Sequence, residues 1–68
     1  MQLSARNQLS ATVQSITLGG VMAEVVVDCG GQEIVSVITR RSAESLGLKE
    51  GDAVTVVIKS TEVMVAKG

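Results

Sequence analysis

Aromatic side chains are absent from this 68-residue chain, which contains no Phe, Tyr or Trp. Without them the protein cannot stack nucleobases, offer a flat platform to a sugar ring or enclose a quaternary ammonium in an aromatic cage. Histidine is absent too, which removes the commonest general base. Because the serines also have no partner at a recognised catalytic spacing, we expect that the protein is not an enzyme.

Sulfur ligands are almost absent as well, since Cys29 is the one cysteine of the sequence and cannot form a disulfide within the chain. Zinc would lack its soft ligands and the carboxylates are too sparse for a calcium loop, so we expect no metal and no cofactor. We interpret Cys29 as an incidental free thiol. Nothing indicates an oxidising compartment or a signal peptide, and a cytoplasmic location is predicted.

Charge and long apolar runs are also scarce. Six basic and seven acidic side chains give a net charge of −1, which provides no basic surface for a phosphate backbone, so no nucleic acid partner is expected. No apolar run approaches the roughly 18 residues of a membrane span, so no membrane partner is expected either. A chain this short, without a disulfide or a metal, is marginally stable alone, and we predict a homo-oligomer.

In several runs of the sequence, valines and other apolar residues alternate with polar ones, and glycines separate these runs. This pattern is typical of short strands joined by turns. A shift of phase near Gln14 predicts a bulge in the first strand. Ser42 is predicted to cap a short helix that Gly47 ends. The predicted strands cover residues 7–18, 21–28, 32–39, 53–59 and 62–66.

The predicted fold class is therefore all-β with one short helix. A single domain over residues 1–68 would form a five-stranded Greek-key barrel of the OB type, which closes its own sheet edges. The pair Gly19-Gly20 is predicted to supply the positive φ of a tight hairpin turn, and Cys29-Gly30-Gly31 is predicted to make a second turn.

Carboxylates gather around the predicted helix and the turn after it, at Glu44, Glu50 and Asp52. A paired acid and base would be one interpretation. We favour solvated surface charges, which is the ordinary role of carboxylates in such positions.

Cationic and hydroxyl donors occur together at the ends of two predicted strands, in Ser-Ala-Arg-Asn at residues 4–7 and Lys-Ser-Thr at residues 59–61. A tetrahedral dianion is best held by many short donors with one or two cations, which this set supplies. The alternative is that Arg6 and Lys59 are ordinary surface charges and the serines are turn formers. The residue types alone leave both interpretations open.

Four motifs resemble those of the molbindins, the molybdenum-pterin-binding proteins of the Mop/TOBE domain family. They are Ser-Ala-Arg-Asn-Gln at residues 4–8, Ala-Glu-Val-Val at 23–26, Leu-Gly-Leu-Lys-Glu-Gly at 46–51 and Lys-Ser-Thr-Glu-Val-Met at 59–64. The similarity extends over nearly the whole chain. It implies an OB-like barrel that exchanges a strand with a partner to form a dimer, and three such dimers in a hexamer that stores molybdate or tungstate in the cytoplasm.

The resemblance also implies the site residues. Arg6 and Lys59 would neutralise the anion while hydroxyls and amides orient it. Thr39 would come from another subunit, the alternative for this β-branched residue being a packing role. The shared site would consist of Ser4, Ala5, Arg6, Lys59 and Ser60 from one subunit with Thr39 from another. A second type of site, built largely from backbone groups, would involve Gly20, Val21, Met22 and Ala23.

Two hypotheses from other classes remain. Residues 38–56 also resemble the helix and turn of swapped-hairpin DNA-binding regulators, although the chain lacks a basic face. The chain could instead be a structural or accessory domain without a ligand of its own.

Overall fold

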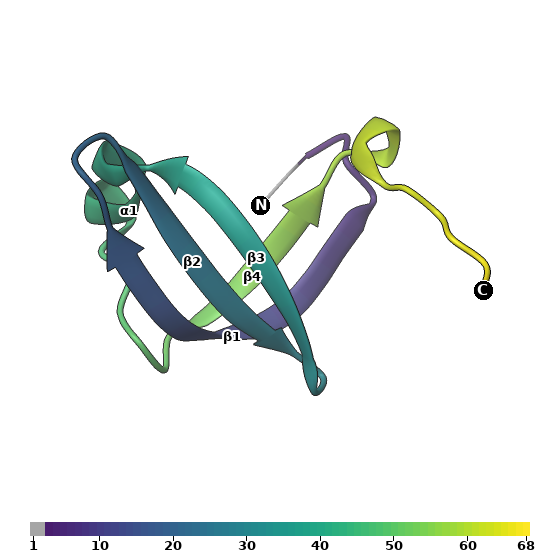
Figure 1. The fold of residues 1–68 in the computed structure, drawn as a ribbon, viewed down its shortest axis with the longest axis horizontal. Helices are drawn as coiled ribbons and strands as arrows, with labels where there is room; N and C mark the ends of the chain where they lie inside the picture. The colour runs from purple at the N-terminus through teal and green to yellow at the C-terminus, as the bar shows by residue number, and fades with distance from the viewer. Residues whose placement is uncertain (1–2) are drawn as a thin grey trace.

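A four-stranded antiparallel sheet forms the body of the protein, as the computed structural model shows for the residues that it describes, 3–68 (Figure 1). The strand order β3-β2-β1-β4 makes β3 and β4 the two edges. The predicted all-β class with one short helix is confirmed. The elements are β1 (Asn7–Leu18), β2 (Met22–Cys29), β3 (Gln32–Thr39), α1 (Arg40–Leu46), β4 (Ala53–Ile58) and the 3-10 helix η1 (Ser60–Glu62).

Strand β1 bends at a bulge, as the shift of phase predicted. Its register against β2 shifts between Val13 and Ser15, so that Gln14 has no opposite residue. The first half of β1 pairs with β4 and the second half with β2. Because a bulge increases local twist, one 12-residue strand can serve both halves of a strongly curved sheet (Figure 1).

The core lies on the inner face of this curved sheet and is made of small side chains. Partly buried Ile34 and Ile38 of β3 and Val54 and Val56 of β4 pack against it. An apolar hollow of about 210 Å³ remains on this face, with side chains of both edge strands in its wall. The buried residues are Ala11, Val13, Ala23, Val25, Val27 and Ala43.

The two glycine pairs have different roles. Gly30 and Gly31 have φ angles of 59° and 87° and close the β2–β3 hairpin, as predicted. The prediction of positive φ at Gly19-Gly20 is wrong, because neither residue has it. Gly19 is required for another reason, since a Cβ there would lie 2.9 Å from the carbonyl oxygen of Met22.

Helix α1 begins at Arg40, three residues before the start that a cap at Ser42 implies, and it has a different cap. The hydroxyl of Thr39, not Ser42, is the N-cap acceptor, and it receives the backbone N–H of Ser42 at 3.1 Å. Gly47 ends the helix in the left-handed conformation, as expected. Within residues 3–68, no helix has the length and apolar character needed to cross a membrane.

The predicted fifth strand is wrong for the single chain. Residues 60–62 form η1, and residues 63–68 have no regular structure and extend away from the sheet (Figure 1). Met64 and Val65 are 94% and 93% exposed. A strand needs a neighbour for its backbone groups, and the described residues of this chain do not pair with the segment, so the barrel stays open and has four strands.

Three glycine-to-alanine variants test these roles. Gly31→Ala should lower the free energy of unfolding by about 1–2 kcal/mol, because a side chain is strained at its positive φ. Gly19→Ala should also destabilise, because of the close Met22 carbonyl, whereas Gly20→Ala should change little, since its Cβ would meet open space. Urea unfolding at one fixed protein concentration measures all three, and equal losses at Gly20 and Gly31 would contradict the assignment.

Candidate anion sites

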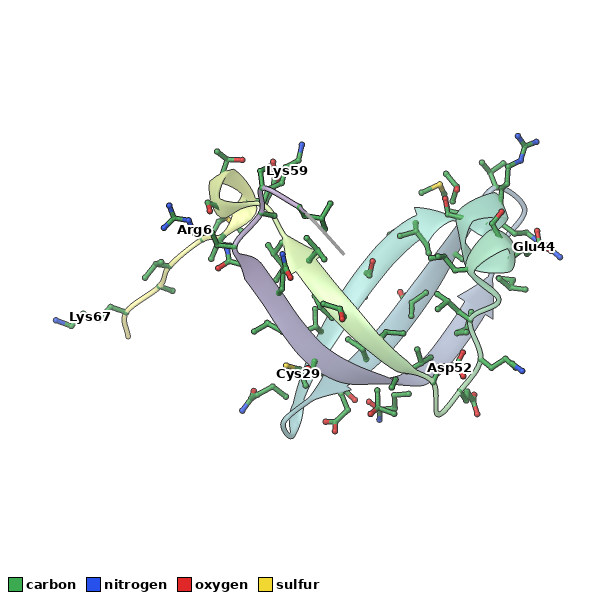
Figure 2. The ribbon with its side chains drawn as sticks, turned by 180° about the vertical axis from the view of Figure 1, so that it is seen from behind. Arg6, Cys29, Glu44, Asp52, Lys59 and Lys67 are labelled. Atoms are coloured by element: carbon green, nitrogen blue, oxygen red, sulfur yellow. The ribbon has the colours of Figure 1, made fainter. Side chains whose placement is uncertain are left out.

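Antiparallel pairing of β1 with β4 brings the two donor segments of the sequence together. Asn7 pairs with Ile58 at the end of the ladder, so Arg6 and Lys59 lie directly beyond this pair on neighbouring chain segments. Figure 2 shows Arg6 and Lys59 at the same end of the molecule, opposite the end that carries Glu44. Segments more than 50 residues apart in sequence therefore form one local surface.

A hollow of about 520 Å³ lies at this end, and we call it the terminal hollow. Four of the predicted site residues line it, namely Ser4, Ala5, Lys59 and Ser60. Arg6 is next to them in the chain but is not part of the wall. The complete lining is Leu3, Ser4, Ala5, Val57, Lys59, Ser60 and Thr61.

Backbone carbonyls at the terminal hollow are already bound by donors of the chain. The side-chain amide of Gln8 donates to the carbonyl oxygen of Ala5 at 2.8 Å. In η1, the carbonyl of Lys59 accepts from Glu62 at 2.9 Å. The N–H groups that begin η1 have no partner inside the helix, as at any helix start, so the backbone here has donors to spare.

The cations at this end are not neutralised by neighbouring carboxylates. Between residues 3 and 68 the one ion pair joins Arg40 and Glu44, at 3.7 Å and at the far end of the molecule. Arg6 and Lys59 are exposed and make no ion pair of their own. Two free cations with hydroxyl and amide donors form an arrangement that can hold a divalent oxyanion.

Thr39 does not belong to the terminal hollow of its own chain. It lies at the start of α1, at the opposite end of the sheet (Figure 1). Its hydroxyl donates to the hydroxyl of Ser42 at 2.7 Å in addition to capping the helix. Within one chain the structure therefore does not bring Thr39 near Lys59.

A second hollow, of about 430 Å³, lies beside Thr39, and we call it the loop hollow. Of the four residues predicted for a backbone-built site, Gly20 and Val21 line it. Met22 does not line it, and Ala23 is 1% exposed and packed in the core. The complete lining is Gly20, Val21, Thr39, Arg40, Arg41 and Glu44.

The other candidates have structural roles. The carboxylate of Asp52 accepts the backbone N–H of Lys49 at 2.9 Å and so closes the turn before β4. Cys29 is a free, half-buried thiol that packs against the core. In the described part of the chain, no three His, Cys, Asp or Glu side chains are grouped as a metal ion would require.

Sequence reasoning missed Gln8 and Arg40, which bind carbonyl oxygens next to the two hollows. Gln8 does occur in the motif at residues 4–8, but its side-chain bond to Ala5 follows from the backbone geometry before β1. Arg40 donates to the carbonyl of Gly19, which is 21 positions away in the chain. No spacing rule predicts either contact.

Comparison with known proteins identifies the family. The TOBE domain family matches residues 3–65 of the chain. The chain belongs to the TOBE domain family. This match includes residues 38–56, the segment on which the resemblance to swapped-hairpin regulators depended.

Two relatives are similar to this chain over nearly their full length, and a third is similar over part of its length. Molybdenum-pterin-binding protein 3 of Clostridium pasteurianum is 50% identical over 66 residues, which are 96% of this chain and 97% of that protein. A solved molybdate-binding protein from Sporomusa ovata has a TM-score of 0.94 and 48% identity, covering 98% of this chain and 100% of that one. A structure of ModG, a cytoplasmic molybdate-binding protein, has a TM-score of 0.84 and 41% identity over 88% of this chain and 43% of its own. The OB-like architecture and the recognition as a Mop protein are thereby confirmed.

The cap residue Thr39 provides a test of the local structure at the loop hollow. Thr39→Ala should lower the free energy of unfolding by about 1 kcal/mol, because the N–H of Ser42 loses its acceptor. Thr39→Ser keeps a hydroxyl and should recover most of the loss. Thermal melts without added anion give the comparison, and a serine variant as unstable as the alanine variant would indicate a packing role for the threonine methyl group instead.

Proposed function

We propose that this chain binds molybdate or tungstate at subunit interfaces of a homo-oligomer and serves the cytoplasmic storage and homeostasis of these oxyanions. The observation that carries the proposal is the terminal hollow, where Lys59 meets hydroxyls and free amides and Arg6 follows directly after the wall residue Ala5, both cations without an ion pair among the described residues. The family membership supplies the identity of the anion, because the similar proteins are named for molybdate or molybdenum. The proposed role is that of a binding protein, not an enzyme.

The proposed shared site is completed by a second chain. Ser4, Arg6, Lys59 and Ser60 lie at one end of the sheet and Thr39 at the other, so a single chain cannot surround one anion with all five. Two chains packed with opposite ends together would unite them. The terminal hollow is also open to solvent on its own, and a partner would remove water and strengthen each charged hydrogen bond.

The C-terminal segment supports the proposed strand exchange. Val63, Met64 and Val65 are exposed beyond β4, while an apolar hollow remains open between the edge strands β3 and β4. An extended segment of a partner would pair with the free backbone groups of an edge strand and at the same time cover the hollow. We propose that residues 62–66 form the fifth strand in the barrel of a partner, and that three such dimers build a hexamer.

The loop hollow is the proposed second class of site. Gly20 and Val21 would contribute backbone N–H groups, and Met22 and Ala23 remain candidates for positions that only the assembled protein would expose. A site made of amides recognises the four oxygens of a tetrahedral anion without adding formal charge. The net charge of −1 is compatible with this mode of binding, because each anion is held locally.

Charge removal at the terminal hollow should weaken binding. Arg6→Ala and Lys59→Ala are each expected to raise the Kd for molybdate at the shared site at least about tenfold, because each removes a charge-assisted hydrogen bond. Lys49→Ala is the matched control, since it removes the same charge from the turn before β4. Isothermal titration at constant ionic strength measures the change, and an Arg6→Ala variant with unaltered affinity would remove Arg6 from the site.

Assembly and selectivity can be measured together by native mass spectrometry. The protein should be a hexamer that takes up several molybdate ions even with a large excess of sulfate. Since an interfacial anion binds only the assembled form, molybdate should also raise the thermal midpoint. A monomer that takes up no anion would contradict the proposal and favour an accessory domain without a ligand.

A further inference from the structure

Three carbonyl oxygens in and beside the loop between β1 and β2 accept hydrogen bonds from donors of the chain. The N–H of Gly19 donates to the carbonyl of Met22 at 2.7 Å. The N–H of Arg40 donates to the carbonyl of Val21 at 2.8 Å. The guanidinium Nη1 of Arg40 donates to the carbonyl of Gly19 at 3.2 Å. Three acceptors are thus engaged, two of them by one residue.

The side chain of Arg40 is held in place from its other side. Its Nε lies 3.7 Å from a carboxylate oxygen of Glu44, one turn further along α1. The planar guanidinium can therefore bridge the helix and the loop with two separate N–H groups, which the single ammonium of a lysine cannot do in the same geometry. Arg41, the next residue, lines the same hollow, but its side chain makes no hydrogen bond or ion pair with any described residue.

Two consecutive amides of the loop remain without a partner. Among residues 3–68, neither the N–H of Gly20 nor that of Val21 donates to a protein acceptor, and both residues line the loop hollow. A carbonyl turned toward this hollow would repel an anion, whereas a free N–H attracts it. Whether the hollow attracts or repels an anion therefore depends on the direction in which the peptide groups of residues 19–22 point.

We propose that Arg40 is a positioning residue for oxyanion binding in the loop hollow. It does not contact the anion. Its guanidinium binds the carbonyl of Gly19 on the protein side, while its backbone N–H, which every variant keeps, binds that of Val21. The N–H of Gly20 lies in the same trans peptide group as the Gly19 carbonyl and points the opposite way, so that it is offered, beside the free N–H of Val21, to the oxygens of a tetrahedral anion. This inference rests on the proposed function and assigns to Arg40 a task that its charge alone would not perform.

The test compares three variants of the full-length protein with molybdate as the probe. Arg40→Ala removes the guanidinium, Arg40→Lys keeps the charge but not the fork, and Arg41→Ala removes an equal charge that binds no loop carbonyl. The first readout is the change in the backbone amide NMR shifts of Gly20 and Val21 on addition of molybdate. The second is the Kd of the loop site, measured in a Lys59→Ala background that weakens the terminal hollow.

Both Arg40 variants should bind at the loop at least about tenfold more weakly, with the molybdate-induced shifts of Gly20 and Val21 lost. Arg41→Ala should raise the Kd of the loop site about threefold or less, as expected for the removal of an exposed charge, and the molybdate-induced shifts should be retained. Binding at the terminal hollow should be unchanged by the Arg40 variants in the wild-type background. If Arg40→Ala fails to fold, Arg40→Lys alone decides between the roles.

Other outcomes overturn the inference in distinguishable ways. An Arg40→Lys variant that binds at the loop like the wild type, or an Arg41→Ala variant that loses as much as Arg40→Ala, would show that only charge matters. Wild-type protein that binds molybdate without any shift at Gly20 and Val21 would refute the loop site and leave the proposed function intact. Wild-type protein that binds no molybdate at all would refute both.

Discussion

The open barrel is the constraint on which the rest of the structure depends. Four strands and one seven-residue helix cover a core whose buried members are all alanine or valine, and β3 and β4 keep free edges. Small side chains bury little apolar surface, and the free energy from that burial scales with area. A chain of this kind would gain stability from contacts with a second copy, which under the proposed function makes an interface a natural position for a ligand site.

Both hollows obtain their donor character from hydrogen bonds that are made behind them. Gln8 binds the carbonyl of Ala5 at the terminal hollow, and Arg40 binds the carbonyls of Gly19 and Val21 at the loop hollow. When the oxygen of a trans peptide group is bound within the protein, the N–H of the same group, which the next residue carries, points to the other side. A nearly neutral chain can in this way attract an anion without a strongly basic surface.

Local patterns predicted the elements whose structure depends on local causes. Alternation of apolar residues with period two predicted the strands, a shift of phase predicted the bulge at Gln14, and Gly30-Gly31 predicted the turn between β2 and β3. The predictions failed where two different structural roles require the same residues. A glycine can serve conformation or close approach, as at Gly19, and residues 62–66 alternate like a strand whichever chain pairs with them.

The site was less accessible to such reasoning than the fold. The residue types alone were compatible either with an anion site at residues 4–7 and 59–61 or with ordinary surface residues there. The family resemblance decided in favour of the anion site. The pairing of Asn7 with Ile58 gives the physical reason why these segments meet. Arg40 could not be predicted, because its importance depends on the direction of peptide groups in a distant loop.

The separation of Thr39 from the terminal hollow limits how copies of the chain can assemble under the proposed function. Each chain has one end rich in cations and hydroxyls and one end with the loop hollow. Two chains related by a two-fold axis can place the first end of each against the second end of the other, which creates two equivalent sites at once. An anion at either site then holds both chains, so that occupancy of one favours the geometry of the other. In this arrangement anion binding and assembly would be coupled, so that a measurement of either one would report on the same equilibrium.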